Sequence, residues 1–366
     1  MLAGCSAGVA ASSRPACRRR RRLAAIAAHV AGGATNTPRG DQLQGYGRVA
    51  ASQPPVFDTV RDLAAAWEFF EANSFVVVRA LCADEVAALD VAADRWTREF
   101  RQQEWSELLF WPLIDYADDV QPFVRHPSVM PLVDRALGGS GKVRFQQCNW
   151  RQYPRGYGRR RGADGEWIPS ARAMAFHADS NLPSRHTRQP YMPLDYVSAF
   201  TYLTDTNPRT PALCVVPRSP RYATLSEAAD AFGDSYVEQP IYGRAGTCVV
   251  MDSAILHTRL DGDGDAARRM LHVSYSRYSW ERTADGSWRG PATTLNQAAD
   301  ADAKFGMKGL VPQSLAQSTD YAERLFYSNW TPSMSAWAFE GFDPTFRTRQ
   351  AVPGSPDPAL RLVDTQ

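Results

Sequence analysis

Apolar residues recur at helical spacing in the first part of the chain and at strand spacing further on. Residues 58–73 and 83–100 each place apolar side chains on one stripe, which predicts two helices. The continuous apolar run at 75–78 predicts a short buried strand between them. A shorter helix is predicted within 120–137, ahead of a pair of glycines. The pattern therefore indicates a helix–strand–helix unit followed by one more helix.

From residue 143 onward the pattern changes to short apolar runs separated by turns that contain glycine or proline. The predicted strands occupy residues 143–153, 172–176, 196–203, 213–216, 247–251 and 270–278. One helical insertion is predicted at 224–233. Many short strands with such turns are typical of a β-sandwich or a jelly roll, so the fold class is predicted to be mainly β with flanking helices.

The first forty residues differ in composition from the rest of the chain. They contain seven arginines, five of them consecutive at 18–22, and no acidic residue. This composition is typical of mitochondrial or plastid transit peptides, so we expect residues 1–50 to be a disordered targeting leader of an intracellular, organellar protein. A nuclear signal and a simple basic tail are alternatives. Residues 22–30 also resemble the nonapeptide of peroxisomal import, with valine in its last position.

The body of the chain carries a mildly acidic charge. Without the seven leader arginines, 34 basic residues stand against 39 acidic ones, which argues against a nucleic-acid-binding surface. Six dispersed cysteines without a Cys-x-x-Cys pair indicate reduced thiols, and no apolar run has the length of a membrane span. We expect one globular domain at 55–345 and a disordered tail at 350–366.

Three residues of the strand-rich region are candidate metal ligands. His177 and Asp179 are two positions apart, and residues two apart in an extended chain point to the same side. His257 follows at the end of an apolar run. Two imidazoles and one carboxylate suit Fe(II), Mn(II), Co(II) or Zn(II), and they form the facial ligand set of non-haem Fe(II) oxygenases. Because a lone His-x-Asp is common, the prediction depends on the combination with His257 and a nearby arginine.

That arginine indicates an acidic ligand. The turn sequence Asp-Gly-Asp-Gly-Asp at 261–265 separates Arg268 from His257, and a chain reversal there brings the two close, on neighbouring strands or across two sheets. A guanidinium holds a carboxylate through two parallel hydrogen bonds. Arg269 is the alternative, since only one of two successive strand residues can face the interior. We favour Arg268.

The stretch from about residue 56 to residue 280 resembles the phytanoyl-CoA dioxygenase family of Fe(II)- and 2-oxoglutarate-dependent oxygenases. The resemblance lies in the helix–strand–helix opening and in a series of motifs, namely Tyr153-Pro-Arg-Gly, Phe176-His-Ala-Asp, Val-Ser-Ala-Phe-Thr-Tyr-Leu-Thr-Asp at 197–205, Ala-Leu-Cys-Val-Val-Pro-Arg-Ser at 212–219, and the pair His257 and Arg268. The chain departs from the family at 217–220, where Pro-Arg-Ser-Pro replaces the usual Pro-Gly-Ser-His.

The resemblance implies a fold and a cofactor set. The fold is a double-stranded β-helix, a jelly-roll or cupin-like barrel with helices packed outside. His177, Asp179 and His257 would bind Fe(II), Arg268 would bind the distal carboxylate of 2-oxoglutarate, and O2 would be the second co-substrate. The products would be succinate, CO2 and an oxidised substrate. A carboxylate at 179 implies hydroxylation, because related halogenases carry a small residue there.

Two further polar residues are candidate co-substrate contacts. Gln147 and Asn149 alternate onto one face of a strand that often lines the 2-oxoglutarate pocket in this family, so either could hydrogen-bond the co-substrate. Ordinary strand polarity is the alternative for both.

The substrate itself is left open, as a small organic or lipid-like molecule. Trp150, Tyr191 and Trp280 are candidate substrate contacts, with packing in the core as the alternative. The basic segment 155–161 could meet an anionic group or be a solvated loop. Two other classes compete with the oxygenase hypothesis. A cupin-like metal protein would not need Arg268, and a non-catalytic binding module would not need an intact ligand set.

Overall fold

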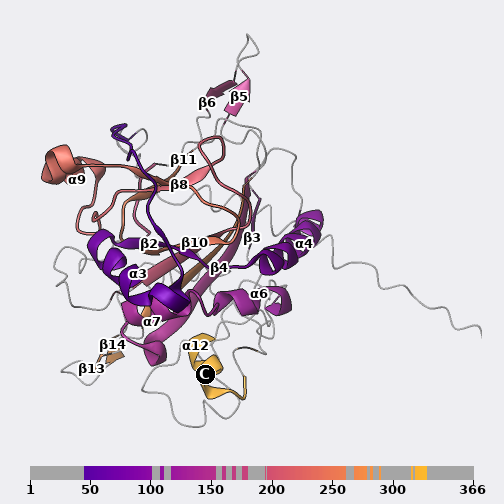
Figure 1. The fold of residues 1–366 in the computed structure, drawn as a ribbon. Coiled ribbons are helices and arrows are strands. Elements are labelled where there is room, and N and C mark those ends of the chain that lie inside the picture. Colours follow the sequence, from indigo (N-terminus) through magenta and orange to yellow (C-terminus); the bar gives the residue numbers. More distant parts are fainter. Residues whose placement is uncertain are drawn as a thin grey trace, which may run out of the picture.

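A computed structural model describes the protein at residues 45–100, 108–110, 117–153, 159–161, 167–169, 175–179, 194, 196–260, 268–277, 281–282, 288–289, 315 and 318–327. Figure 1 shows a core of curved β-strands with helices packed beside it. Most of the predicted leader and all of the predicted tail lie outside the described residues.

Seven strands form the larger sheet, in the order β1–β2–β10–β7–β12–β4–β3. Their bounds are Val56–Phe57 (β1), Phe75–Arg79 (β2), Leu108–Phe110 (β3), Val143–Tyr153 (β4), Tyr196–Tyr202 (β7), Thr247–Asp252 (β10) and Arg268–Arg277 (β12). The long strand β12 lies between β4 and β7 and is antiparallel to both. This central position places the residues of β12 in the middle of the sheet.

A smaller sheet of three strands, in the order β11–β8–β9, shares its core with the larger one. Its strands are His257–Leu260 (β11), Ala212–Val215 (β8) and Gln239–Ile241 (β9). A further bridge joins His177 to His257 at the edge of this sheet. Two hairpins stand apart from both sheets, Arg159–Arg161 with Trp167–Pro169 (β5, β6) and Glu281–Arg282 with Trp288–Arg289 (β13, β14).

The chain crosses repeatedly between the two sheets. It passes from β4 to the His177 bridge, back to β7, across to β8 and β9, back to β10, across to β11 and back to β12. This alternation is the winding of a jelly roll, or double-stranded β-helix, so the predicted fold class is confirmed. Within the described residues the strands do not close into a continuous barrel.

Helices cover the outer face of the larger sheet (Figure 1). They are Thr59–Asn73 (α3), Ala83–Phe100 (α4), Ala117–Val124 (α6), Met130–Ala136 (α7) and Tyr321–Tyr327 (α12). Helix α9 (Leu225–Phe232) packs instead against the smaller sheet, and short 3-10 turns occupy Ser140–Lys142 (η1) and Gly233–Ser235 (η2). Strand residues, and not the helices, therefore line the space between the two sheets.

Local signals account for how the first helix leads into the sheet. The Asp58 side chain accepts a hydrogen bond from the Val60 amide at the start of α3. The helix ends at Ser74, which has a left-handed φ of 67° and donates its amide to the Phe70 carbonyl. Gly246 precedes β10 with a φ of 90°, and a Cβ atom there would lie 2.4 Å from the Leu81 carbonyl oxygen.

Several predicted elements match the structure, and two differ from it. The helices at 58–73, 83–100 and 224–233 are confirmed within one or two residues. The predicted helix at 120–137 is instead two helices, α6 and α7, separated by a segment that contains Pro127, because proline disfavours helix at the residue before it.

Most of the predicted strand at 172–176 lies outside the described residues, so it stays a prediction. The second difference concerns a strand near the candidate site. His257 does not end the apolar strand before it; β10 stops at Asp252, and His257 begins β11 in the other sheet.

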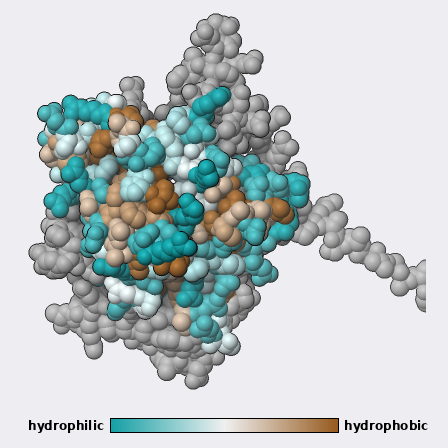
Figure 2. All heavy atoms as spheres, viewed as in Figure 1, coloured by the Kyte–Doolittle hydropathy of each residue, from teal (hydrophilic) through white to brown (hydrophobic). Residues whose placement is uncertain are grey.

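The described surface mixes polar and apolar side chains. In the view of Figure 2, hydrophilic residues surround apolar ones near the middle of the face. The exposed large apolar residues are Tyr46, Val49, Val56, Val60 and Val91. Among the described helices, none combines the length and apolar character required to cross a bilayer.

Candidate metal centre

Strand pairing brings the three predicted metal ligands together. His177 and His257 exchange two backbone hydrogen bonds, of 2.9 and 2.8 Å, and their ring centroids are 4.4 Å apart. Asp179 follows two residues after His177 and lies on the same side. Its Oδ1 atom lies 3.6 Å from His177 Nε2, and its Oδ2 atom lies 3.7 Å from His257 Nε2. Two segments eighty residues apart thus form one cluster.

Both histidines present a bare nitrogen to this cluster. His177 Nδ1 lies 2.8 Å from the Ala175 carbonyl oxygen, and His257 Nδ1 lies 3.0 Å from the Ile255 carbonyl oxygen. A carbonyl oxygen only accepts hydrogen bonds, so each Nδ1 carries a proton, and in the neutral imidazole Nε2 keeps its lone pair. This arrangement orients an imidazole for metal binding.

The spacing fits a single ion. Ligand atoms about 2.1 Å from a metal lie about 3.0 Å apart at right angles and about 3.6 Å apart at 120°. The observed separations of 3.6 and 3.7 Å are too long for hydrogen bonds and close to the wider of these values. In the part of the chain that the structure describes, this is the one group of three or more His, Cys, Asp or Glu side chains able to converge on an ion. Imidazole and carboxylate donors suit Fe(II), Mn(II), Co(II) or Zn(II).

Electrostatics prepares the cluster for a cation. Burial acts against ionisation of Asp179, but the two imidazoles hold the pKa of its carboxyl group well below the usual range. Burial, together with the neighbouring His177, lowers the pKa of His257 to about 4. Burial also opposes protonation of His177, yet Asp179 raises its pKa overall. Near neutral pH the cluster therefore holds an ionised carboxylate beside at least one neutral imidazole.

The structure distinguishes Arg268 from Arg269. Arg268 is 2% exposed and faces the space between the sheets. Arg269 points to the opposite face, where it donates to Asp90 and Asp94 of α4 at 2.5 Å each. Alternation along β12 explains the difference. His257 and Arg268 lie on strands of different sheets, so these two strands do not pair with each other.

Arg268 is a buried cation with unused hydrogen-bond donors. Its Cζ atom lies 5.2 Å from the Tyr153 ring centroid and 5.3 Å from that of Tyr202, and its Nη2 contacts Met270 Sδ at 2.6 Å. Its Nε and Nη1 have no hydrogen-bond partner. Burial lowers the pKa of this guanidinium, and Arg259 lowers it further. Buried N–H donors without a hydrogen-bond partner are energetically costly unless a ligand accepts hydrogen bonds from them.

The two predicted polar contacts on β4 also face the space between the sheets. Gln147 pairs with Ser274 and Asn149 with His272 across the β4–β12 ladder. The Gln147 amide donates to Ser274 Oγ at 3.1 Å, and its Oε1 has no partner. Asn149 Nδ2 lies 3.0 Å from His272 Nδ1. Both side chains line the same interior face as Arg268.

The substrate contact predicted for Trp150 is wrong on geometric grounds. Trp150 alternates to the outer face of β4, is fully buried, and packs edge-to-face on Trp96 of α4 with ring centroids 5.4 Å apart. It is a core residue between sheet and helix. The other two candidates, Tyr191 and Trp280, lie outside the described residues, as do the side chains of the basic segment 155–161.

Sequence reasoning missed three residues that line the same interior space. Arg151 and Tyr153 continue the alternation that begins at Gln147, and His272 lies on β12 four positions after Arg268. The period-two pattern that selected Gln147 and Asn149 would also have found Arg151. His272 could have been found in the same way, because it lies an even number of positions from Arg268 and therefore on the same face of the strand.

Residues 217–220 lie in a turn after β8. Arg218 has a left-handed φ of 65° there. Its amide donates to the Asn73 carbonyl, and its guanidinium lies 4.9 Å from the Phe232 ring centroid. Ser219 Oγ accepts the Leu256 amide at 2.8 Å, directly before His257. The turn therefore supports the segment that leads to the second histidine.

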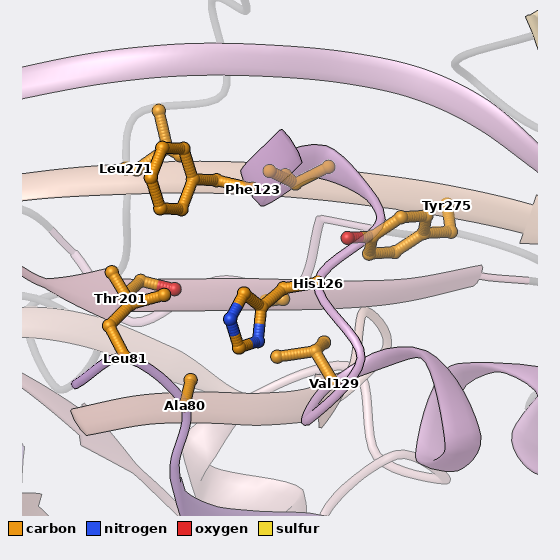
Figure 3. A pocket seen from close by; sticks show the side chains of 10 residues that line it. Ala80, Leu81, Phe123, His126, Val129, Thr201, Leu271 and Tyr275 are labelled. Carbon is orange, nitrogen blue, oxygen red and sulfur yellow. The ribbon is translucent and has the colours of Figure 1, made fainter. Parts of the chain in front are cut away.

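A small cavity lies on the opposite face of the sheet, and Figure 3 shows the side chains that line it. They are mostly apolar, and His126 is the one histidine among them. His126 Nε2 lies 3.0 Å from Glu85 Oε1, and its Nδ1 accepts the Ser128 amide at 3.2 Å. Both ring nitrogens are therefore satisfied, which indicates a structural histidine.

Comparison with known proteins gives no match to a family model and none to a curated protein. Membership of the phytanoyl-CoA dioxygenase family is thus not shown. The fold and site define the class at a coarser level, as a double-stranded β-helix protein with a candidate His-x-Asp···His metal centre.

Solved structures include distant likenesses. HygX from Streptomyces hygroscopicus, with nickel and 2-oxoglutarate bound, is 14% identical and covers 63% of this chain and 95% of its own, with a TM-score of 0.44. The non-heme alpha ketoglutarate dependent epimerase SnoN from nogalamycin biosynthesis is 14% identical over 61% of this chain and 84% of its own, with a TM-score of 0.44. AviO1 from Streptomyces viridochromogenes Tue57 is 18% identical over 62% of this chain and 97% of its own, with a TM-score of 0.43.

Proposed function

We propose that the protein is an Fe(II)- and 2-oxoglutarate-dependent dioxygenase. The observation that carries the proposal is the presence, on one interior surface, of two kinds of incomplete group. One is a His177–Asp179–His257 cluster with bare Nε2 atoms, and the other is the buried Arg268 guanidinium with two unpartnered N–H groups. A metal ion would bind the bare nitrogens of the cluster, and the carboxylate of an acid would accept the two free N–H groups of Arg268.

The side chains have separate roles in this proposal. His177, Asp179 and His257 would hold Fe(II) through two imidazoles and one carboxylate, and ligands other than protein would complete its coordination. Arg268 binds the distal carboxylate of 2-oxoglutarate. Bound iron and 2-oxoglutarate supply the oxidative chemistry, in which O2, the 2-oxo acid and a C–H bond give succinate, CO2 and a hydroxylated product.

The protein contributes position and exclusion of water. Arg268 is held between the rings of Tyr153 and Tyr202, which limits the movement of its guanidinium. Its burial means that a carboxylate bound there loses little strength to solvent screening. Asp179 supports hydroxylation, because its carboxylate would occupy the ligand position that a small residue at 179 would leave open for a halide. The substrate class remains a small organic molecule.

The first test is formation of succinate from 2-oxoglutarate by the Fe(II)-loaded, full-length protein in air. We expect slow succinate formation without added substrate, lost in Asp179→Ala. Arg268→Gln should raise the KM for 2-oxoglutarate by about 10- to 100-fold, the equivalent of a lost charge-assisted pair. Arg269→Gln is the matched control and should leave KM unchanged, because Arg269 lies on the outer face of the same strand.

The competing class is a metal-binding protein of the same fold that does not use 2-oxoglutarate. Metal binding that depends on His257, combined with no succinate formation and no detectable binding of 2-oxoglutarate, would favour that class. The unpartnered donors of Arg268 favour the oxygenase, since a metal site alone gives them no ligand.

A further inference from the structure

A chain of polar side chains, all buried except the half-buried Arg151, crosses the interior face of the larger sheet beside the metal centre. It joins strands β4, β12 and β7 and ends in the segment after β10. The links are Arg151 Nε to Asn149 Oδ1 (3.1 Å), Asn149 Nδ2 to His272 Nδ1 (3.0 Å), His272 Nε2 to Ser274 Oγ (2.9 Å), Ser274 Oγ to Ser198 Oγ (3.1 Å) and Ser198 Oγ to Ser253 Oγ (3.0 Å). We call this set the interior chain.

The hydrogen-bond direction along the interior chain follows from its first member. Arg151 Nε can only donate, so Asn149 must turn its oxygen toward Arg151 and its amide nitrogen toward His272. His272 therefore accepts at Nδ1 and is the neutral Nε2–H tautomer, which donates to Ser274. The Asn149 amide cannot reverse without breaking two bonds.

The interior chain holds Arg151 in a defined place. Asn149, immobilised by His272, anchors the Nε end of the guanidinium. The ring of His272 is itself stacked on Phe200, with centroids 4.0 Å apart and an interplanar angle of 14°. Polar groups buried in this way are costly unless satisfied, and once satisfied they make a rigid support.

Arg151 lies one interior position from Arg268 along the β4–β12 ladder, on the side of His272. It pairs with Met270 across the ladder, one interior position from the Arg268–Tyr153 pair on one side and from the His272–Asn149 pair on the other. Its hydrogen-bond partner Asn149 contacts His272, whose ring stacks on Phe200, and the Phe200 ring centroid lies 6.3 Å from that of His257. Like burial and Arg259, the positive charge of Arg151 lowers the pKa of the Arg268 guanidinium.

Arg151 and Arg268 therefore place two positive charges on the same interior face. Holding a guanidinium near two metal-binding histidines and a second buried guanidinium costs electrostatic energy. A dianionic ligand that spans from the metal to Arg268 passes Arg151 and relieves this repulsion. Its two negative charges would then face two guanidinium groups and one metal ion.

We propose that Arg151 is a second co-substrate-binding residue, which contacts the metal-proximal carboxylate of the 2-oxo acid, and that Asn149 and His272 are its positioning residues. The inference rests on the proposed function and deepens it. Arg268 and Arg151 would recognise opposite ends of one dicarboxylate, so the site would select against 2-oxo acids with a single carboxylate.

Equilibrium binding to the full-length protein loaded with Zn(II), which cannot support redox turnover, separates the two arginines. The probes are 2-oxoglutarate and 2-oxopentanoate, which keeps the metal-proximal carboxylate and lacks the distal one. Arg151→Gln should weaken both ligands by about 10- to 100-fold. Arg268→Gln should weaken 2-oxoglutarate by a similar factor and leave 2-oxopentanoate within about threefold of wild type.

Further variants separate positioning from damage to the fold. Asn149→Leu removes the anchor of Arg151, and it should reproduce the ligand pattern of Arg151→Gln at a smaller size. Arg151→Lys keeps the charge and should restore part of the 2-oxopentanoate affinity. Arg269→Gln, on the outer face, should bind both ligands as wild type does. Bound zinc is measured in every variant, and a stoichiometry equal to wild type shows that the metal centre is intact.

Two results would overturn the inference alone. In one, Arg151→Gln binds both ligands normally while Arg268→Gln loses 2-oxoglutarate. In the other, Arg151→Gln weakens 2-oxoglutarate but not 2-oxopentanoate, which would place Arg151 at the distal carboxylate. Absence of 2-oxoglutarate binding to zinc-loaded wild type would instead overturn the proposed function, and the inference with it.

Discussion

The two faces of the seven-stranded sheet are both buried, yet they are built from different chemistry. The outer face presents residues such as Val76, Val250 and Val273 to the helices. The inner face of the same strands presents Arg268 and His272 among apolar neighbours. Apolar burial stabilises a fold without directing chemistry, whereas buried polar groups are costly and persist where they are satisfied or await a ligand.

Histidine shows the same contrast within one residue type. On the outer face, His126 donates to Glu85 and accepts from Ser128, so neither ring nitrogen is available. In the candidate metal centre, His177 and His257 each use Nδ1 on a backbone carbonyl and leave Nε2 free. Burial alone therefore does not identify a histidine as functional. A ring nitrogen that is left free for a ligand does.

The largest effect is expected from removing a metal ligand. His257→Ala should abolish high-affinity binding of Fe(II) or Zn(II), a loss well beyond the 10- to 100-fold typical of residues that only support a ligand. His126→Ala is the matched control. It should leave metal affinity unchanged and lower the free energy of unfolding by about 1–3 kcal/mol, through the lost buried hydrogen bonds.

Metal affinity by competition titration and unfolding by denaturant measure the two effects. Loss of metal binding in His126→Ala, or its retention in His257→Ala, would remove the distinction between the two faces.

The next largest effect is expected on stability, from the outer face. Trp150→Ala should lower the free energy of unfolding by about 3–5 kcal/mol, because it opens a cavity against Trp96. The milder Trp150→Phe should leave the affinity for 2-oxoglutarate at its wild-type value, since the ring faces the helices. Chemical denaturation and equilibrium binding check these outcomes. A changed ligand affinity in Trp150→Phe with normal metal binding would restore the original substrate-contact hypothesis.

A third, smaller effect is the pH dependence of metal binding. The pKa of His177 is raised, so below that pKa the metal must displace its proton, and the apparent affinity should fall about tenfold per pH unit. As the pH rises through this pKa the affinity should level off. His257, with its pKa near 4, and ionised Asp179 should release no further proton above about pH 5. A hundredfold fall per unit between pH 5 and 6 would show that His257 is also protonated there.

The smallest effect is expected from the ion pairs of Arg269. Asp94→Asn should change the free energy of unfolding by less than about 1 kcal/mol, since Asp94 is half exposed and solvent screens the pair. It should not alter binding of 2-oxoglutarate. An altered 2-oxoglutarate affinity, measured by calorimetry, would show that the outer face communicates with the interior site.

Much of this arrangement could be predicted from sequence, for identifiable reasons. Strand alternation places Arg268 and Gln147 on one face, and the two-residue spacing places His177 beside Asp179. The same rule contradicts a substrate role for Trp150, because it is one position out of phase with Asn149.

Other features depended on tertiary structure. The transfer of His257 to a separate strand in the smaller sheet follows from the turn after Asp252, which carries no strong local signal. The pairing of His272 with Asn149 depends on the register between two distant strands, which includes a shift at Ser274 and Tyr275. Sequence spacing alone does not determine such a register.

The most direct test of the account is an anaerobic titration of the Fe(II)-loaded, full-length protein with 2-oxoglutarate, followed by visible absorption. Chelation of iron by the 2-oxo acid should produce a weak charge-transfer band in wild type and in Arg269→Gln, require far more 2-oxoglutarate in Arg268→Gln, and be absent in His257→Ala. No band in iron-loaded wild type, or a band that survives in His257→Ala, would contradict the central claim that iron and 2-oxoglutarate meet on the inner face of the sheet.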